Sequence, residues 1–164
     1  MLRGVAITTQ EAIGCQLVAE ALQLSGTVRV RVFGTSMFPA VLPGDVLVVQ
    51  RKELGRLLLG DIVLFKRDER LFAHRVVGQM DRNGVPCVVT SGDSLPANDP
   101  PVFPHELLGR VTSIVRGTRQ ISPQATLFQQ LISSLLRNSD FLSRCFLWLL
   151  CRNRSASHAI ECPT

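Results

Sequence analysis

The sequence contains no tyrosine, a single tryptophan and no run of lysine or arginine residues. Its 164 residues carry a net charge of +5, and the basic residues are dispersed among apolar segments. Domains that bind nucleic acid ordinarily gather their basic residues on one face or along one helix. The sequence therefore argues against nucleic acid as a partner.

Cysteine pairs at metal-binding spacing are also missing. The cysteines are an odd number, five, and none forms a CxxC motif; they are Cys15, Cys87, Cys145, Cys151 and Cys162. A disulfide framework or a zinc site would need paired or regularly spaced cysteines. We therefore expect reduced thiols in a cytoplasmic protein, with no metal and no organic cofactor.

No stretch reaches the roughly eighteen uncharged apolar residues that a membrane span requires. The N-terminal MLRGVAITTQEAIG lacks the apolar run of a secretory signal. The most apolar segment, FLSRCFLWLL at 141–150, is interrupted by Arg144. We therefore expect neither a signal sequence nor a spanning helix.

The 46% hydrophobic content is typical of a folded chain, and its length fits one main domain. Residues 1–27 form an amphipathic helix in this interpretation, with a capping box at Thr8 and Glu11 and a stop at Ser25-Gly26. From VRVRV onward the apolar period changes to two, which is typical of strands. Strands are predicted at 28–32, 45–49, 61–65, 71–77, 85–90 and 107–115. Residues 28–120 are therefore predicted to be a mainly β domain, a small antiparallel barrel or sandwich.

Helical spacing returns after Pro123, where Leu127, Leu131 and Leu135 share one stripe. We expect amphipathic helices over 121–152 and a flexible tail over 153–164. Two interpretations of the helical segment stay open. It contacts a membrane surface peripherally, with Trp148 near the headgroups, or it packs on the β domain or on a second subunit of a homodimer.

Two residues could carry chemistry, Ser36 in GTSMFP and His74 in LFAHRVV. A serine hydroxyl is a poor nucleophile unless a positioned base removes its proton. The other histidines lie in a proline-rich loop (His105) and a polar tail (His158). Alone, Ser36 is an ordinary turn residue and His74 an ordinary strand residue, so the motifs around them decide.

Four segments resemble, in order, the signatures of the type I signal peptidase superfamily, which includes the LexA-like peptidases. They are GTSMFPAVLPGDVLVV, GDIVLFKRDERLFAHRVVGQ, VVTSGDSLPANDP and LLGRV. The resemblance covers roughly residues 28–116 and implies a signal-peptidase-like β fold. One branch of the family uses a lysine base and another a histidine. His74 stands at the base position here, whereas Lys66 lies upstream of it, so the chain resembles the serine–histidine branch.

The resemblance implies that Ser36 is the nucleophile, His74 the general base and Asp99 the carboxylate that orients the histidine. Asp93 matches the Gly-Asp of the third signature and is expected to be a supporting carboxylate, although the two aspartates could exchange roles. Turn chemistry alone would also explain both aspartates, because aspartate in loops rich in glycine, proline and asparagine often accepts hydrogen bonds from backbone amides.

The resemblance also points to residues beside the nucleophile. The backbone amide of Ser36 would bind the oxyanion, with Thr35 as a further donor because Gly34 stands where many relatives have a hydroxyl. Met37 and Phe38 are expected to contact substrate. The substrate implied is a peptide or precursor protein, bound as an extended strand with small residues before the cut.

The function that these expectations describe is a serine endopeptidase that cleaves a peptide or leader sequence. Two alternatives stay open: a LexA-like module that cuts its own chain or regulates a partner, and a peptide-binding module without activity. The usual N-terminal membrane helix of signal peptidases is replaced by the polar stretch around Gln10, Gln16 and Glu20. The nature of the precursor is therefore open too.

Overall fold

The computed structural model of the chain describes residues 9–123. It contains one α-helix, α1 (Thr9–Ser25), followed by strands and one short 3-10 turn, η1 (Leu54–Arg56). The strands are β1 (Thr27–Arg31), β2 (Val46–Gln50), β3 (Ile62–Arg67), β4 (Arg70–Arg82), β5 (Val85–Ser91), β6 (Leu107–Arg116) and β7 (Arg119–Ile121). The mainly β architecture with an N-terminal helix is therefore confirmed.

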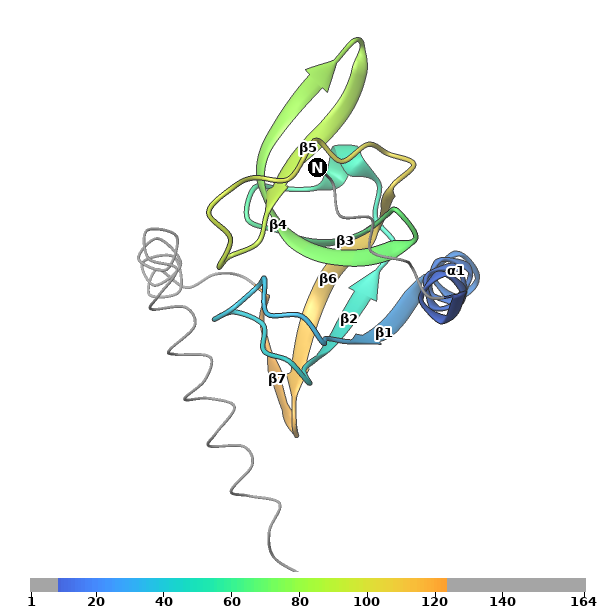
Figure 1. Ribbon diagram of the computed structural model, residues 1–164, viewed down its shortest axis with the longest axis vertical. Helices are drawn as coiled ribbons and strands as arrows, with labels where there is room; N and C mark the ends of the chain where they lie inside the picture. The colour runs from blue at the N-terminus through green and yellow to red at the C-terminus, as the bar shows by residue number, and fades with distance from the viewer. Residues whose placement is uncertain (1–8, 124–164) are drawn as a thin grey trace, which may run out of the picture.

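The strands form one antiparallel sheet in the order β1-β2-β6-β3-β4-β5, and β7 pairs with β6. The β4–β5 hairpin projects from one end of the molecule and the β6–β7 hairpin from the other (Figure 1). No ladder joins β1 to β5 within residues 9–123, so this sheet is not closed. The sequence predicts a barrel or a sandwich, and the described residues form one unclosed antiparallel sheet with β1 at one edge.

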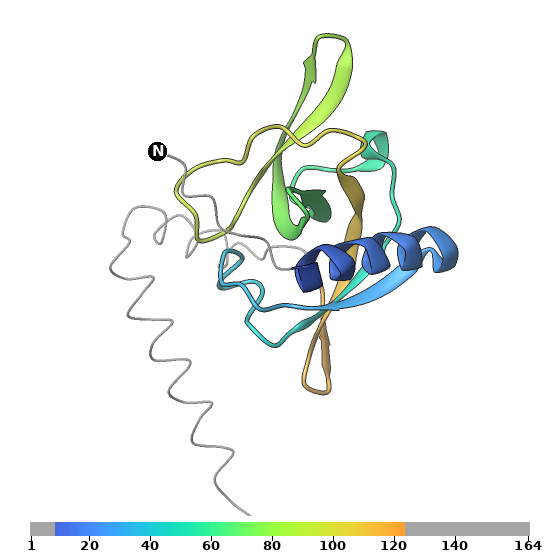
Figure 2. The same cartoon turned by 45° about the vertical axis from the view of Figure 1, so that its right-hand side comes forward.

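Helix α1 ends where the sequence predicts, at Ser25, and Gly26 follows with a φ of +71° that favours glycine. Cys15 and Leu22 are buried against the sheet. By contrast, Ile13, Leu17 and Leu24 are exposed on the helix surface. The apolar residues that repeat most regularly in the sequence thus lie on the outer face of α1, which rests beside β1 (Figure 2).

Turns between the strands follow local chemistry. The Asp45 carboxylate accepts a hydrogen bond from the Leu42 amide (2.8 Å), and the Asp61 carboxylate accepts one from the Leu58 amide (3.0 Å). Asn83 and Gly84 have positive φ values of 57° and 79°, as a two-residue hairpin between β4 and β5 requires. The Gly-Asp pairs before β2 and β3 therefore act as turn residues.

Two clusters of buried apolar side chains hold the sheet together. The larger one lies under α1 and contains Leu22, Met37, Ala40, Val41, Leu47, Val49, Ile62, Leu64, Val111 and Ile114. The second lies between η1 and the β3–β5 strands and contains Leu54, Leu57, Val63, Phe65, Val76, Val88 and Val102. Adjacent residues of β3, such as Leu64 and Phe65, point into different clusters, so β3 is buried on both faces.

Of the predicted C-terminal helices (121–152) and tail (153–164), only residues 121–123 are described, and they are the last residue of β7 and the two residues after it. The same holds for Thr8, one half of the predicted capping box. Within residues 9–123, no helix is long and apolar enough to cross a membrane.

Candidate active site

Ser36 lies in the connection between β1 and β2, at the start of a tight turn. The Phe38 amide donates to the Thr35 carbonyl (3.1 Å), and the Val41 amide donates to the Met37 carbonyl (2.9 Å). Met37 and Phe38 are buried, whereas Ser36 is half-buried. The apolar residues after the serine therefore anchor the turn, and the serine side chain stays at the surface of the fold.

His74 stands in the middle of β4, where it is paired with Val63 of β3. Its side chain is 4% exposed. The imidazole lies against the rings of Phe65 and Phe72, with centroids 6.0 and 6.1 Å away. The strand fixes the backbone of His74, and the two phenylalanine rings flank the imidazole.

Asp99 comes from the long connection between β5 and β6. Its carboxylate accepts a hydrogen bond from His74 Nδ1 (2.6 Å). On the other side of the ring, His74 Nε2 lies 2.9 Å from Ser36 Oγ. Because an ionised carboxylate can only accept, Nδ1 carries the proton, and neutral Nε2 can accept the hydroxyl proton of Ser36. The structure thus brings Ser36, His74 and Asp99 into one hydrogen-bonded chain.

The surroundings of Asp99 favour its ionised form. Burial raises the pKa of the carboxyl, but hydrogen bonds from His74 and Thr90 lower it. The positive charge of Arg67, and that of His74 when its ring is protonated, lower it further, so the pKa of Asp99 lies below its ordinary value. A permanent negative charge next to Nδ1 stabilises an imidazolium, the form that the histidine takes after accepting a proton.

Asp93 does not contact His74. Its two carboxylate oxygens accept hydrogen bonds from Arg75 Nε (2.8 Å) and Nη2 (2.7 Å). The Arg75 Nη1 group donates to the carbonyls of Gly60 (2.8 Å) and Pro123 (3.2 Å). Both charged side chains are largely buried. This ion pair fastens the loop that carries Asp99 to the strand that carries His74, which fits the supporting role expected of Asp93.

The same loop also contacts the turn at residues 36–41, called the nucleophile turn below because it carries the candidate nucleophile Ser36. The Ser36 carbonyl accepts hydrogen bonds from the Ser94 amide and from Ser94 Oγ, both at 3.0 Å. Gly92 passes so close that a Cβ there would lie 2.7 Å from the Ser36 carbonyl oxygen. Only glycine permits this approach, so the loop that presents Asp99 also holds the backbone of Ser36.

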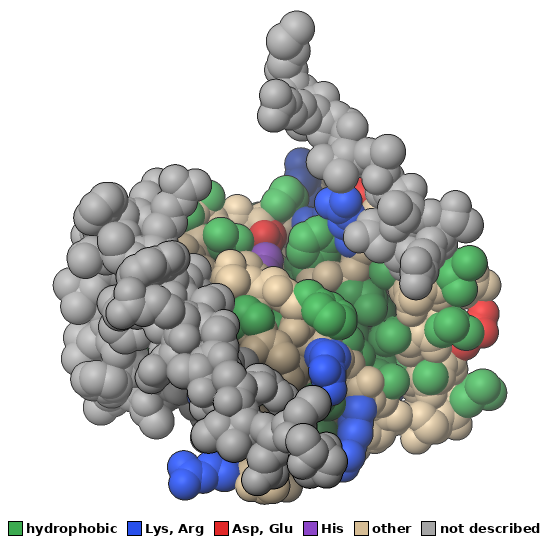
Figure 3. Space-filling view, turned by 60° about the horizontal axis from the view of Figure 1, so that its bottom comes forward, with side chains coloured by type: hydrophobic (Ala, Val, Ile, Leu, Met, Phe, Trp, Pro, Cys, Tyr) green, Lys and Arg blue, Asp and Glu red, His purple; other side chains and the backbone are tan. Residues whose placement is uncertain are grey.

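A cavity of about 400 Å³ opens beside Ser36 and His74. Its walls come from β1, β2, β3, β4 and the nucleophile turn, and most are apolar: Val30, Arg31, Val32, Phe33, Gly34, Ser36, Met37, Val41, Leu47, Leu64, Leu71, Phe72, Ala73 and His74. Figure 3 shows hydrophobic side chains gathered around a histidine and an acidic side chain on one face. An apolar cavity with a few convergent polar groups is the usual form of a ligand site.

The other sequence expectations have different outcomes. Met37 lines the cavity, but Phe38 is 1% exposed and does not, so its side chain belongs to the interior and a direct substrate contact is not supported. Thr35 is exposed next to Ser36. The ammonium of Lys66 lies 3.0 Å from a Glu69 carboxylate oxygen, an ion pair at the far end of β3. His105 stacks on Phe103 and is not part of the hydrogen-bonded chain.

Sequence reasoning missed several supporting residues. Thr90 binds Asp99, Ser94 binds the nucleophile turn, and Arg75 pairs with Asp93. Arg67 holds the loop after Asp99 by donating to the carbonyls of Pro100 and Pro101 and to Glu106. Only Arg75 had a sequence signal, because it directly follows the candidate base.

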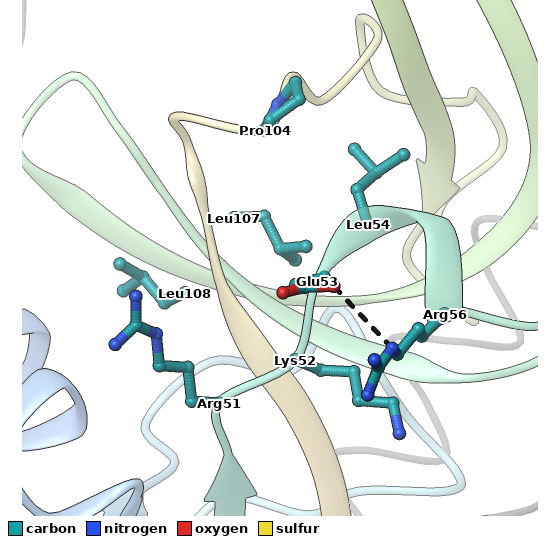
Figure 4. A pocket seen from close by; sticks show the side chains of 8 residues that line it. All are labelled: Arg51, Lys52, Glu53, Leu54, Arg56, Pro104, Leu107 and Leu108. Carbon is teal, nitrogen blue, oxygen red and sulfur yellow. Dashed lines mark ion pairs between the residues drawn. The ribbon is translucent and has the colours of Figure 1, made fainter.

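A second cavity, of about 440 Å³, lies at the turn after β2, where basic residues meet apolar side chains of β6 (Figure 4). It is lined by Arg51, Lys52, Glu53, Leu54, Arg56, Pro104, Leu107 and Leu108. Glu53 and Arg56 form an exposed ion pair at 3.6 Å. None of the three residues of the hydrogen-bonded chain lines this cavity, so it is a separate feature of the surface.

Residues 9–123 contain no group of three or more histidine, cysteine, aspartate or glutamate side chains placed to hold a metal ion. Within this range Cys15 and Cys87 are buried, and the Cys15 thiol donates a hydrogen bond to the Glu69 carbonyl at 2.9 Å. No protein-family model matches the sequence, and no curated protein matches it. The chemistry of the site must therefore be inferred from its own geometry.

Proposed function

We propose that the protein is a serine endopeptidase that cleaves a peptide or precursor protein through Ser36, His74 and Asp99. The observation that carries this proposal is the continuous chain from Ser36 Oγ to His74 Nε2 and from His74 Nδ1 to Asp99 Oδ2. Nucleophile, base and orienting carboxylate stand in the order that acyl transfer by a serine requires. The side chains of His74 and Asp99 are largely buried, whereas Ser36 is half-buried and lines the cavity, so a substrate in the cavity can reach its hydroxyl.

The proposed reaction follows from these contacts. Ser36 Oγ attacks the carbonyl carbon of the scissile peptide bond while His74 Nε2 takes the hydroxyl proton. The Ser36 amide donates to the oxygen that becomes negative, and Thr35 is a further candidate donor. His74 then gives the proton to the leaving amine. In the second half, His74 takes a proton from water as the water oxygen attacks the acyl carbon. His74 then gives this proton to Ser36 Oγ as the bond between Oγ and the acyl carbon breaks, which releases the carboxylic acid product and regenerates Ser36.

The edge of the sheet offers a place for the substrate main chain. Strand β1 pairs only with β2 among the described strands, and Val30 and Arg31 of β1 line the cavity. An extended peptide that added to this edge would pass Ser36, and main-chain hydrogen bonds would supply much of the affinity. Apolar side chains before the cut would enter the cavity. The resemblance to signal peptidases favours small residues at these positions.

The proposal is tested with the full chain and a mixture of peptides that vary in the residues around the cut. Mass spectrometry identifies cleavage products, and Ser36→Ala should reduce turnover at least about a thousandfold, because it removes the nucleophile. Ser25→Ala, at the exposed end of α1, is the matched control and should keep full turnover. Fragments of the chain itself would indicate self-cleavage. Equal turnover by Ser36→Ala and the native chain would refute the proposal.

A further inference from the structure

Thr90 shares an acceptor atom with the candidate base. Its hydroxyl donates to Asp99 Oδ2 at 2.7 Å, and His74 Nδ1 donates to the same oxygen at 2.6 Å. Two donors on one oxygen restrict the rotation of the carboxylate about its side-chain torsions. A carboxylate held in this way presents a fixed acceptor to the imidazole.

The backbone reinforces this arrangement. The Asp99 amide donates to the Thr90 carbonyl at 2.8 Å, so the two residues are joined through main chain and side chain together. Thr90 lies on β5 opposite Val76 of β4, two residues beyond His74. The β4–β5 ladder thus sets the position of Thr90 relative to His74, and Thr90 in turn sets the position of Asp99.

The side chain of Thr90 is fully buried, so its hydroxyl needs a hydrogen-bond partner inside the protein. The residue is 0% exposed, as is Val88 two positions earlier on the same face of β5. Valine has nearly the same shape as threonine and would avoid the cost of removing a hydroxyl from water. A hydroxyl at this buried position is favourable only with a partner, and that partner is Asp99.

Asp99 is surrounded by donors and cations from three strands. His74 approaches from β4 and Thr90 from β5, and both donate to it. Arg67, from β3, contributes its charge, while its own hydrogen bonds go to Glu106 and to the carbonyls of Pro100 and Pro101. Among these groups, only Thr90 has a side chain that carries no charge at any pH, so its hydroxyl can be removed without changing the net charge.

We propose that Thr90 is a positioning residue whose hydroxyl fixes the orientation of the ionised Asp99 and thereby holds His74 with Nε2 free to accept the proton of Ser36. This inference rests on the proposed peptidase function. Thr90 does not touch the reacting atoms and acts through Asp99.

The test compares Thr90→Val, which removes the hydroxyl, with Thr90→Ser, which keeps it. Turnover of a cleaved peptide is measured on the full chain. In the non-cleaving Ser36→Ala background, NMR follows the titration of the Asp99 carboxyl carbon and the tautomer of His74. Thr90→Val should lower kcat about tenfold with KM nearly unchanged, since a hydrogen bond to a charged group is lost. It should also raise the pKa of Asp99, and Thr90→Ser should restore both values.

Thr112→Val is the control, because it removes a strand threonine hydroxyl that donates to the Val48 carbonyl, away from Asp99. It should change neither kcat nor the Asp99 titration. If Thr90→Val does not fold, Thr90→Ser and Thr90→Ala, which differ in the hydroxyl alone, provide the same comparison. A merely structural role would lower the melting temperature and leave the Asp99 titration and kcat as in the native chain, and that result overturns the inference.

The two proposals can fail separately. If the native chain cleaves peptides and Thr90→Val cleaves them equally well, the role of Thr90 is refuted and the peptidase function stands. If the native chain cleaves no peptide, the peptidase function fails. A raised Asp99 pKa in Thr90→Val would then still support the positioning of the carboxylate, and an unchanged one would overturn it.

Discussion

Two aspartates lie on one loop, and their partners differ in kind. Asp99 accepts from a neutral imidazole that also faces a serine hydroxyl, whereas Asp93 is bound at both oxygens by the guanidinium of Arg75. The bidentate contact turns the Asp93 carboxylate toward Arg75, and its hydrogen bonds go to Arg75 rather than to His74. Asp99 therefore faces the candidate base, whereas Asp93 joins the loop to β4 through Arg75.

We expect Asp99→Asn to reduce kcat by a factor of about 10³ to 10⁴, because the amide no longer selects the tautomer with its proton on Nδ1. Its melting temperature should fall less than that of Asp93→Asn, because the amide oxygen can still accept the hydrogen bond from Thr90. Asp93→Asn is the matched variant and should lose about 3 kcal/mol of unfolding free energy, since it leaves Arg75 buried without its charged partner. Urea denaturation and peptide turnover measure the two effects. The opposite pattern would assign the orienting role to Asp93.

At the scale of elements, the site depends on one loop that contacts both strand β4, which carries His74, and the turn that carries Ser36. The connection between β5 and β6 carries Asp99 to His74, and through Gly92 and Ser94 it reaches the carbonyl of Ser36. The nucleophile turn and the base strand are thus bound to the same segment. A shift of this loop would change both hydrogen bonds of the candidate base.

Gly92→Ala tests this coupling. The new Cβ would lie 2.7 Å from a backbone oxygen of Ser36, so either the loop or the nucleophile turn must move. We expect turnover to fall more than a hundredfold, as about 1 Å of misplacement can cost that much, together with a lower melting temperature. Gly55→Ala, in η1 and outside the cavity beside Ser36, is the control, because a Cβ at Gly55 meets nothing within 4 Å. Native turnover in Gly92→Ala would mean that the loop does not position Ser36.

The elements also show what could be predicted from the sequence. The apolar residues predicted the positions of β2, β3 and β5 to within about one residue at each end of β2 and β5 and two at the end of β3. Strand β2 buries alternate side chains, whereas β3 buries successive ones. Strand β4 continues to Arg82, past the predicted end at Val77, because pairing with β5 extends it through residues that are largely exposed. Strand β7 has only three residues and no apolar alternation, so no pattern revealed it.

The candidate site was predictable to a different degree. Ser36, His74 and Asp99 were found through motifs, since composition and periodicity give a turn serine and a strand histidine no special status. Thr90 could not be found, because threonine is an ordinary strand residue and its role depends on a contact nine residues away. The buried face of α1 could not be predicted from the sequence either. Ile13 and Leu17 follow the helical spacing of apolar residues but are exposed, whereas Cys15 and Leu22 are buried.

For the whole molecule, the site is assembled from distant parts of the chain. Ser36 and His74 are 38 residues apart, and His74 and Asp99 are 25 residues apart. The segments meet because β4 lies between β3 and β5, at the boundary of the two apolar clusters. Next to the hydrogen-bonded chain of Ser36, His74 and Asp99, Arg67 of β3 and Glu106 before β6 are joined by two charge-assisted hydrogen bonds of 2.7 and 2.9 Å.

The carboxylates of Glu106 and Asp99 make the stability of the fold sensitive to acid. Burial raises the pKa of Glu106, but hydrogen bonds from Arg67 and the Phe103 amide, together with the charges of Arg67 and His105, lower it by more in sum. The pKa of Glu106, like that of Asp99, therefore lies below its ordinary value. A carboxyl whose pKa is lowered by folding stabilises the native state above its unfolded pKa, about 4.3 for glutamate and 3.9 for aspartate. That contribution is lost as pH falls through the folded pKa.

We therefore expect the unfolding free energy to be steady from about pH 7 to pH 5 and to fall below pH 5, as the unfolded state binds protons that these carboxylates exclude when folded. Urea denaturation at several pH values measures this decline. Glu106→Gln should be less stable than the native chain at pH 7 and should lose less stability on acidification, because its position no longer titrates. Glu53→Gln, from the exposed pair with Arg56, is the control and should follow the native profile closely. A decline of equal steepness in Glu106→Gln and the native chain would show that the Arg67–Glu106 pair is not a source of the acid sensitivity.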